Sequence, residues 1–225
     1  MGGIAARIVP IALTVALSPV PIVALLVLLI TERARIGSLV MTASWILGNF
    51  LAISIAVFFS SSFPPPRAGL DLGWEAALTF ILGVGLLVTA VFARMARVRR
   101  PSDQGPPAWV RSADNLGPVG GSALALSNAM TSPKNLALVI SAGRIISGST
   151  NRASVIWESI LLYTAVTSIS LLVPTVIYFI GGERSVATLT NWRDFLTAHA
   201  AAIMEVLCLV VGIALSAKGL YNLLS

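Results

Sequence analysis

Residues 131–135 read Thr-Ser-Pro-Lys-Asn, and they place a proline and a lysine inside an apolar run that extends over residues 118–146. A second apolar run, residues 4–30, is interrupted in the same way by Leu-Ser-Pro-Val-Pro at residues 17–21. Proline lacks the N–H group that a helix needs and clashes with the preceding turn, so we expect each helix to break there. Backbone groups freed inside a bilayer must be satisfied by protein or by water in a cavity.

The composition around these two stretches is that of a membrane protein. Of the 225 residues, 56% are hydrophobic and only 11% are charged, whereas a soluble domain carries about 25% charged residues. Apolar runs near or above the roughly 20 residues needed to cross a bilayer predict an all-α integral membrane protein. The six predicted transmembrane helices are residues 4–30, 36–59, 74–92, 118–146, 157–180 and 200–224. We expect the first span to be retained and not cleaved as a signal peptide.

The two proline interruptions fall in the first and the fourth predicted spans. An odd number of crossings separates them, so the second half of the chain is inserted upside down relative to the first. The sequence thus predicts a single membrane domain, residues 1–225, built as an inverted 3+3 repeat. The first repeat covers residues 1–93, a basic cytoplasmic loop covers 94–117, and the second repeat covers 118–225.

The distribution of basic residues predicts the orientation. The loops after spans 1, 3 and 5 carry nine arginines, whereas the opposite side carries five basic residues. Positive charge is retained in the cytoplasm, so both termini are expected outside. Four arginines just past span 3 either anchor this topology or bind anionic head groups of the inner leaflet. We expect the protein in the plasma (inner) membrane, surrounded by membrane lipids.

Several classes of function lack the residues they need. The chain has one cysteine, Cys208, and one histidine, His199, which argues against a His- or Cys-based metal site. The sequence contains no phosphate-binding loop, no nucleophile elbow and no intramembrane carboxylate pair, so it predicts no enzyme and no cofactor. Basic residues in so apolar a chain indicate membrane topology and give no sign of nucleic-acid binding.

Lys134 is the one charged residue deep within a predicted span, where a lysine costs about 2.5–3.5 kcal/mol on insertion scales. After Pro133 a new half-helix begins, and its unpaired N–H groups and positive dipole end favour an anion. The half-helix after Pro19 presents a second such end. The predicted substrate-binding residues surround these two ends: Ser18, Pro19, Pro21, Thr131, Ser132, Pro133, Lys134 and Asn135.

A structural alternative stays open, because buried charges are usually paired. Glu158 and Glu205 lie near the ends of their spans and are the candidate partners of Lys134. Asn49 and Asn128, also at membrane depth, serve equally well as hydrogen-bonding contacts between helices or as ligand contacts.

The chain resembles the GAP family within the LysE superfamily, which comprises the glycopeptidolipid- and sulfolipid-addressing proteins of mycobacteria and their relatives. The resemblance is carried by Ser18-Pro19-Val20-Pro21, by Ser44-Trp45-Ile46-Leu47-Gly48, and by Ser132-Pro133-Lys134-Asn135-Leu136 followed by Ala142-Gly143. It covers nearly the whole chain and departs from the family pattern at Ser44, where a glycine is expected. It implies a six-span plasma-membrane protein of an actinobacterium that moves or displays complex surface glycolipids.

From the residues and the resemblance together, we expect an exporter or flippase of an anionic amphiphile, such as a cell-envelope glycolipid or a lipid precursor. Interrupted helices at matching positions of two inverted halves are typical of transporter binding sites. One alternative is a small-solute exporter for amino-acid-like substrates. Another is a non-transporting accessory protein that couples a lipid synthase to a larger exporter. The sequence leaves homo-oligomerisation and energy coupling open.

Overall fold

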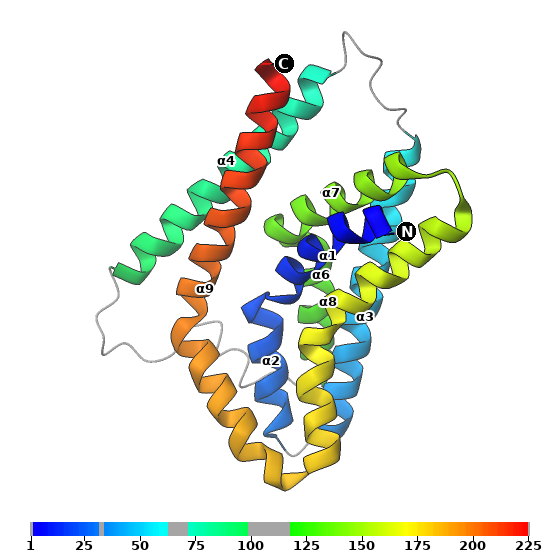
Figure 1. Ribbon diagram of the computed structural model, residues 1–225. Helices are drawn as coiled ribbons and strands as arrows, with labels where there is room; N and C mark the ends of the chain where they lie inside the picture. Colours follow the sequence, from blue (N-terminus) through cyan, green and yellow to red (C-terminus); the bar gives the residue numbers. More distant parts are fainter. Residues whose placement is uncertain (1, 32–33, 63–71, 99–117, 225) are drawn as a thin grey trace. The chain divides into compact units, whose positions relative to one another are not determined.

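The computed structural model describes residues 2–31, 34–62, 72–98 and 118–224, and every element in these ranges is a helix (Figure 1). In chain order the elements are α1 (Gly2–Ala16), α2 (Pro19–Leu29), α3 (Ala34–Ser62), α4 (Leu72–Val98), α6 (Pro118–Thr131), α7 (Pro133–Ser149), α8 (Ala153–Gly181) and α9 (Glu183–Leu224). The all-helical class predicted from the sequence is confirmed for these residues. The predicted basic loop is described only to Val98, and residues 99–117 lie outside the described part.

Several helices have the length and apolarity needed to cross a membrane. Within the described residues these are Ala34–Ser60, Ala153–Gly181 and Ala202–Tyr221, and α1 and α2 qualify together as a pair bent by 53°. These helices fit a multi-pass membrane protein, with three such spans in the described part of the chain, or four if the bent pair is one span. α4 contains a shorter apolar segment, Gly83–Phe92, and α7 carries Lys134 and Arg144. The six-span count stays a prediction.

The chain divides into two compact units. Unit 1 comprises Met1–Phe63 and Pro106–Ala198, and unit 2 comprises Pro64–Gly105 and His199–Ser225. The boundary falls within α9, which is continuous from Glu183 to Leu224. The segment between the fifth and sixth predicted spans, where the spacing of Val186, Leu189, Trp192 and Phe195 or Leu196 predicts a short helix, is helical from Glu183 onward. Unit 1 contains the first two predicted spans of each half of the chain, and unit 2 contains the third span of each half.

In unit 1, α3 packs against α2, α6, α7 and α8, while α1 packs against α7 and α8. Trp45 Nε1 on α3 donates to the Thr167 carbonyl oxygen of α8 at 3.0 Å, and further along α3 the ring of Phe50 stacks on Trp157 at 6.3 Å. The residue numbers on α8 fall as those on α3 rise, so the two helices are antiparallel. This contact joins α3 to α8 through the backbone carbonyl of residue 167, an acceptor that any residue type provides.

Small residues allow α6 and α7 to lie close along α3. A Cβ atom on Gly48 would lie 3.0 Å from the Cβ atom of Ala129, and one on Gly143 would lie 2.8 Å from the carbonyl carbon of Ala56. Gly143 therefore faces backbone that no side chain can displace, whereas Gly48 faces a methyl group. The residue numbers rise together on the two sides of these contacts, from Gly48 with Ala129 to Ala56 with Gly143. α6 and α7 therefore run parallel to α3.

Unit 2 pairs α4 with residues 199–224 of α9. A Cβ atom on Gly83 would lie 2.4 Å from the Ser216 nitrogen, and one on Gly219 would lie 2.5 Å from the Phe80 nitrogen. These two approaches make the helices antiparallel and require glycine at both positions. Leu86, Ala90 and Cys208 form the buried apolar contact between them.

Candidate functional site

The first helix interruption separates α1 from α2. Ser18 is the N-cap of α2, with φ −71° and ψ 113°, and Pro19 and Pro21 follow it in the first turn. Since proline has no N–H group, residues 19 and 21 cannot donate to the carbonyls of Val15 and Leu17. The Ser18 N–H instead bonds the Val15 carbonyl oxygen at 3.1 Å. The helix therefore ends, and the chain turns by 53° before α2 continues.

The second interruption separates α6 from α7 and has nearly the same backbone. Ser132 is the N-cap of α7, with φ −62° and ψ 122°, and Pro133 occupies the first helical turn. The Leu136 N–H closes the first turn on the Ser132 carbonyl oxygen at 2.9 Å. Neither serine makes a side-chain cap bond, so each hydroxyl is available for other contacts.

The two interruptions meet through Lys134. Its ammonium group donates to the Ser18 hydroxyl at 2.9 Å and to the Thr14 carbonyl oxygen at 3.1 Å. The Ser18 hydroxyl in turn donates to Asn135 Oδ1 at 3.4 Å. Ser18 and Lys134 are each 3% exposed and Asn135 is fully buried. A charge-assisted contact thus joins segments that lie more than 110 residues apart in the sequence.

The proline at residue 19 explains why the Thr14 carbonyl can accept this bond. In a continuous helix the Ser18 N–H would bond Thr14 O, but here it bonds Val15 O. Thr14 O is therefore one of the carbonyls left over in the last turn of α1, where a cation is favourable with the helix dipole. Lys134 closes the negative end of α1 while lying in the first turn of α7.

Asn135 also ties the second interruption together. Its side-chain nitrogen donates to the Asn128 carbonyl oxygen at 3.0 Å and to Asn128 Oδ1 at 3.3 Å. These bonds connect α7 back to the last turns of α6. The sequence singled out Asn128 only as a polar residue at membrane depth, without assigning it to this contact. Asn128 lies seven residues, or about two helical turns, before Asn135, and this spacing was the feature of the sequence that could have predicted the contact.

The other predicted site residues make no side-chain bond that links the two interruptions in the described structure. Pro19 and Pro21 are buried at the start of α2, and Ser132 is half-buried. Thr131 is exposed, and its hydroxyl donates to the Ser127 carbonyl oxygen of its own helix at 2.8 Å. Lys134, Asn135 and Ser18 are therefore the members whose side chains contact one another.

The sequence offered two carboxylates, Glu158 and Glu205, as partners of Lys134. Glu158 is exposed on α8. Glu205 is in unit 2, where its Oε1 atom lies 3.6 Å from Arg94 Nη1. No group of three or more metal-ligating side chains occurs among the described residues.

Three further polar atoms are buried in unit 1, on α3 and α8. Asn49 Oδ1, Tyr163 OH and Thr164 Oγ1 have no hydrogen-bond partner within the described structure. On α3, Asn49 directly follows Gly48, which lies against Ala129 of α6. Because α3 and α8 are antiparallel, Asn49 lies at about the same height along the pair as Tyr163 and Thr164. Native buried polar groups are nearly always satisfied, by protein or by water. The interior at this level therefore has spare capacity to bind a polar ligand or water.

Chemically, the assembled residues favour an anion. The ammonium group supplies a positive charge. The first turn of α7 adds the backbone N–H groups of Lys134 and Asn135, because the first N–H that bonds within α7 is that of Leu136. The α2 end is poorer in donors than the sequence suggested, because Pro19 and Pro21 together leave only the Val20 N–H group in that turn. The α7 end is the stronger of the two.

The chain matches a model of a known protein family. The family model described as Sap, sulfolipid-1-addressing protein, matches residues 8–221. No curated protein and no solved structure matches the chain. The matched region contains both helix interruptions and the whole Lys134 contact.

Proposed function

The chain belongs to the sulfolipid-1-addressing protein family, and from this premise we propose that it moves the head group of an anionic cell-envelope lipid across the membrane. The family and the apolar helices make it a lipid-related membrane protein. The proposed substrate is a glycolipid or lipid precursor that carries a sulfate, phosphate or carboxylate. The proposed process is transport without covalent chemistry.

The observation that carries the proposal is the buried contact between Lys134 and Ser18. Intramembrane lysines are costly and commonly mark substrate pathways. Here the lysine lies at the point where two interrupted helices touch, and the N-terminal end of α7 adds further positive potential. A head group that binds the ammonium would compete with Ser18 Oγ and Thr14 O. Binding would then loosen the contact between the two halves of the chain.

An inverted repeat would turn this loosening into alternating access. α1 and α7 are antiparallel, because the end of α1 contacts Lys134 at the start of α7, while the start of α1 and the end of α7 line one pocket. That is the arrangement expected for the first and fourth spans of inverted halves. The division into units also treats the halves alike, since each contributes two predicted spans to unit 1 and one to unit 2. Rocking of one half against the other is the usual mechanism for such folds.

One observation favours a second candidate function. Lys134 already closes the last turn of α1, and such a contact stabilises a fold without any substrate. In this second candidate the protein is an accessory that couples a lipid synthase to a larger exporter, and its lysine is a structural cap. A lipid-movement assay separates the two functions.

The test uses purified protein in liposomes with fluorescent anionic lipids, and it measures transbilayer movement. We expect the native chain to move the lipid, Lys134→Ala to lose at least about 90% of the rate, and Lys134→Arg to keep a measurable part, since a charge-assisted bond contributes about 1.5–3 kcal/mol. Lys218→Met is the matched control, because Lys218 is the other lysine of the chain.

Folding must be compared by thermal unfolding and gel filtration before rates are interpreted. Loss of movement in a folded Lys134→Ala variant supports the transport proposal. Full activity of that variant would show that the lipid does not need Lys134 to cross, and no lipid movement by the native chain favours the accessory function.

A further inference from the structure

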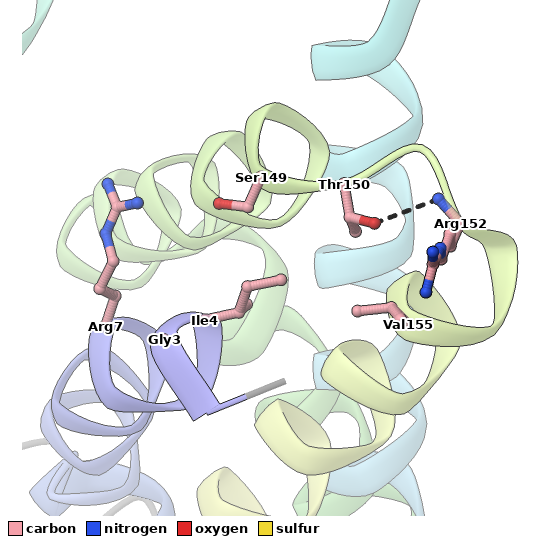
Figure 2. Close-up of a pocket in the computed structure, with 7 residues that line it drawn as sticks. All are labelled: Gly3, Ile4, Arg7, Ser149, Thr150, Arg152 and Val155. Carbon is pink, nitrogen blue, oxygen red and sulfur yellow. Dashed lines mark hydrogen bonds between the residues drawn. The ribbon is translucent and has the colours of Figure 1, made fainter.

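A pocket of about 530 Å³ lies at the other end of α1 and α7 from the Lys134 contact. Its lining residues are Gly3, Ile4, Arg7, Ser149, Thr150, Arg152 and Val155 (Figure 2). They come from the start of α1, the end of α7 and the start of α8, which all belong to unit 1. The volume falls in the range of small-molecule sites, about 300–1,000 Å³.

The charge of this lining is one-sided. It includes two arginines and no acidic residue. Figure 2 shows Arg7 and Arg152 flanking the other lining side chains, with Ile4 and Ser149 between them. Within the described residues neither guanidinium group has a carboxylate partner. Both groups therefore keep their donors available for a ligand.

The starts of α1 and α8 add positive potential to the pocket, whereas the end of α7, which also lines it, adds negative potential. Arg152 is the N-cap residue of α8 and makes no side-chain cap bond, and the first turn of α8 has no acidic residue. The first turn of α1 has none either. A cation at the positive end of a helix dipole is unfavourable for folding. The arrangement becomes favourable when an anion lies between the arginines and the helix ends.

The hydroxyl groups of the pocket have defined roles. Thr150 Oγ1 accepts a hydrogen bond from the Arg152 backbone N–H at 3.1 Å, which leaves its own O–H free to donate. The Ser149 hydroxyl donates to the Ile145 carbonyl oxygen, so its oxygen can accept. The lining thus offers both a donor and an acceptor beside the guanidinium groups, as an anionic head group with hydroxyls requires. Ile4 and Val155 add apolar surface for the adjoining acyl chains.

The position of the pocket fits a lipid at the membrane surface. Ten residues of α1 separate Ile4 from Thr14, and fifteen residues of α7 separate Lys134 from Ser149. At 1.5 Å per residue these separations are about 15 and 22 Å, comparable to half of the roughly 30 Å hydrocarbon core. If the helix interruptions lie at the midplane, the pocket lies at the head-group level of one leaflet.

We propose that this pocket binds the phosphate or sulfate head group of a membrane lipid, held by Arg7 and Arg152. Guanidinium groups are suited to this role because their planar donors match the oxygens of phosphate and sulfate. The proposal goes beyond transport at the Lys134 contact, since it concerns equilibrium binding at the membrane surface. It stands whether or not the protein moves lipid.

The test places a bimane fluorophore on Ser154→Cys, next to the pocket, in a Cys208→Ser background that removes the single native cysteine. The labelled protein, in a neutral detergent at low salt, is titrated with dihexanoyl phosphatidic acid. Dihexanoyl phosphatidylcholine and sodium phosphate are the comparison ligands. We expect a saturable response to phosphatidic acid and a half-saturating concentration at least about tenfold higher in Arg7→Gln with Arg152→Gln, given the strength of hydrogen bonds to charged groups.

Arg193→Gln is the matched control, because Arg193 pairs with Asp194 away from the pocket, and its titration should equal that of the labelled parent. Both pocket arginines are exposed, and each single variant provides a check on folding. An unchanged titration in the double variant overturns the proposal. So does a response to phosphatidylcholine equal to that to phosphatidic acid. Saturation by sodium phosphate at the same concentration as the lipid would assign the pocket to free anions and overturn its assignment to lipid.

Discussion

The two helix interruptions have the same backbone but opposite chemistry. Ser18 and Ser132 are both N-cap residues with extended conformations that differ by less than 10° in each angle, and a proline follows each. After that proline the first interruption continues with Val20 and Pro21, whereas the second continues with Lys134 and Asn135. In the contact between them, the first supplies two acceptors to the ammonium group and the second supplies the charge.

This difference shows how two matching breaks can form one asymmetric site. Two lysines at the same point would repel each other, and two uncharged breaks would have little to hold them together. With the charge on one side only, the contact between the interruptions is complementary. The same asymmetry gives the proposed anion a preferred end, because the α7 break has both the ammonium group and more free N–H groups than the α2 break.

The largest effect is expected when this asymmetry is removed by Ser18→Lys. Two ammonium groups about 3 Å apart repel by about 5 kcal/mol at an effective dielectric constant of 20, so even after the side chains move apart we expect a loss of a few kcal/mol. Thermal unfolding of the purified protein in detergent measures this loss. The variant should unfold at a clearly lower temperature than the parent.

Two further variants distinguish repulsion from crowding. Ser18→Met places an uncharged side chain of similar length at the same position and should lower the unfolding temperature less. The double variant Ser18→Lys with Lys134→Ser moves the charge to the other interruption and should recover part of the loss. A Ser18→Lys protein as stable as the parent would show that the two interruptions are not in contact.

Much of the fold follows from the sequence alone. Apolar runs and proline positions predicted that helices would end near residues 17 and 132, and α1 and α6 end at Ala16 and Thr131. These features are local, so the sequence carries them directly. The grouping of spans into two units depends on packing and could not be predicted from local patterns. The helical spacing of Val186, Leu189 and Trp192 predicts a short helix between the last two spans, but not that this helix continues into the last span as α9.

The sequence could predict which residues belong to the candidate site, but not which residues contact one another there. Lys134 stood out because an intramembrane charge is rare, and its neighbours followed from the same motif. Its partners did not follow, because a span of over 110 residues separates Lys134 from Thr14 and Ser18 and no local pattern encodes that pairing. The role of Thr14 was hidden further, since it contributes its backbone carbonyl and any residue type provides one. The sequence-based candidates Glu158 and Glu205 drew attention to carboxylates, whereas the contacts found are to a hydroxyl and a carbonyl.

A smaller effect is expected from Asn135→Leu, which tests whether the second interruption is tied more tightly than the first. The change removes the bonds from Asn135 to Asn128 and the acceptor of the Ser18 hydroxyl, and it leaves the part-buried acceptors of Asn128 unsatisfied, which costs about 1–3 kcal/mol. Hydrogen–deuterium exchange should speed up at residues 128–136 and change less at residues 14–20. Ser127→Ala, which removes an exposed hydroxyl from α6 next to Asn128, is the control. An equal increase in the exchange rate at both interruptions would contradict the expectation that Asn135 stabilises mainly the second one.

The smallest effect is expected from replacing the prolines themselves. Pro133→Ala restores an N–H group at the first turn of α7, where proline is well tolerated, and should change stability by at most about 1 kcal/mol. Pro19→Ala should also leave its break in place, because Pro21 still provides no N–H group for the Leu17 carbonyl.

The two interruptions should therefore respond alike to loss of the first proline, but for different reasons: a second proline in α2, and the Lys134 and Asn135 contacts in α7. Spin labels on Ser127→Cys and Leu136→Cys, both at exposed positions in a Cys208→Ser background, measure the second break. In a continuous helix the nine residues between them would span about 13.5 Å along the axis. We expect the Pro133→Ala protein to keep the label distance of its parent. A shift to the distribution of a straight helix would mean that proline alone maintains the break, and that the contact with Ser18 forms only because the proline holds α7 in place.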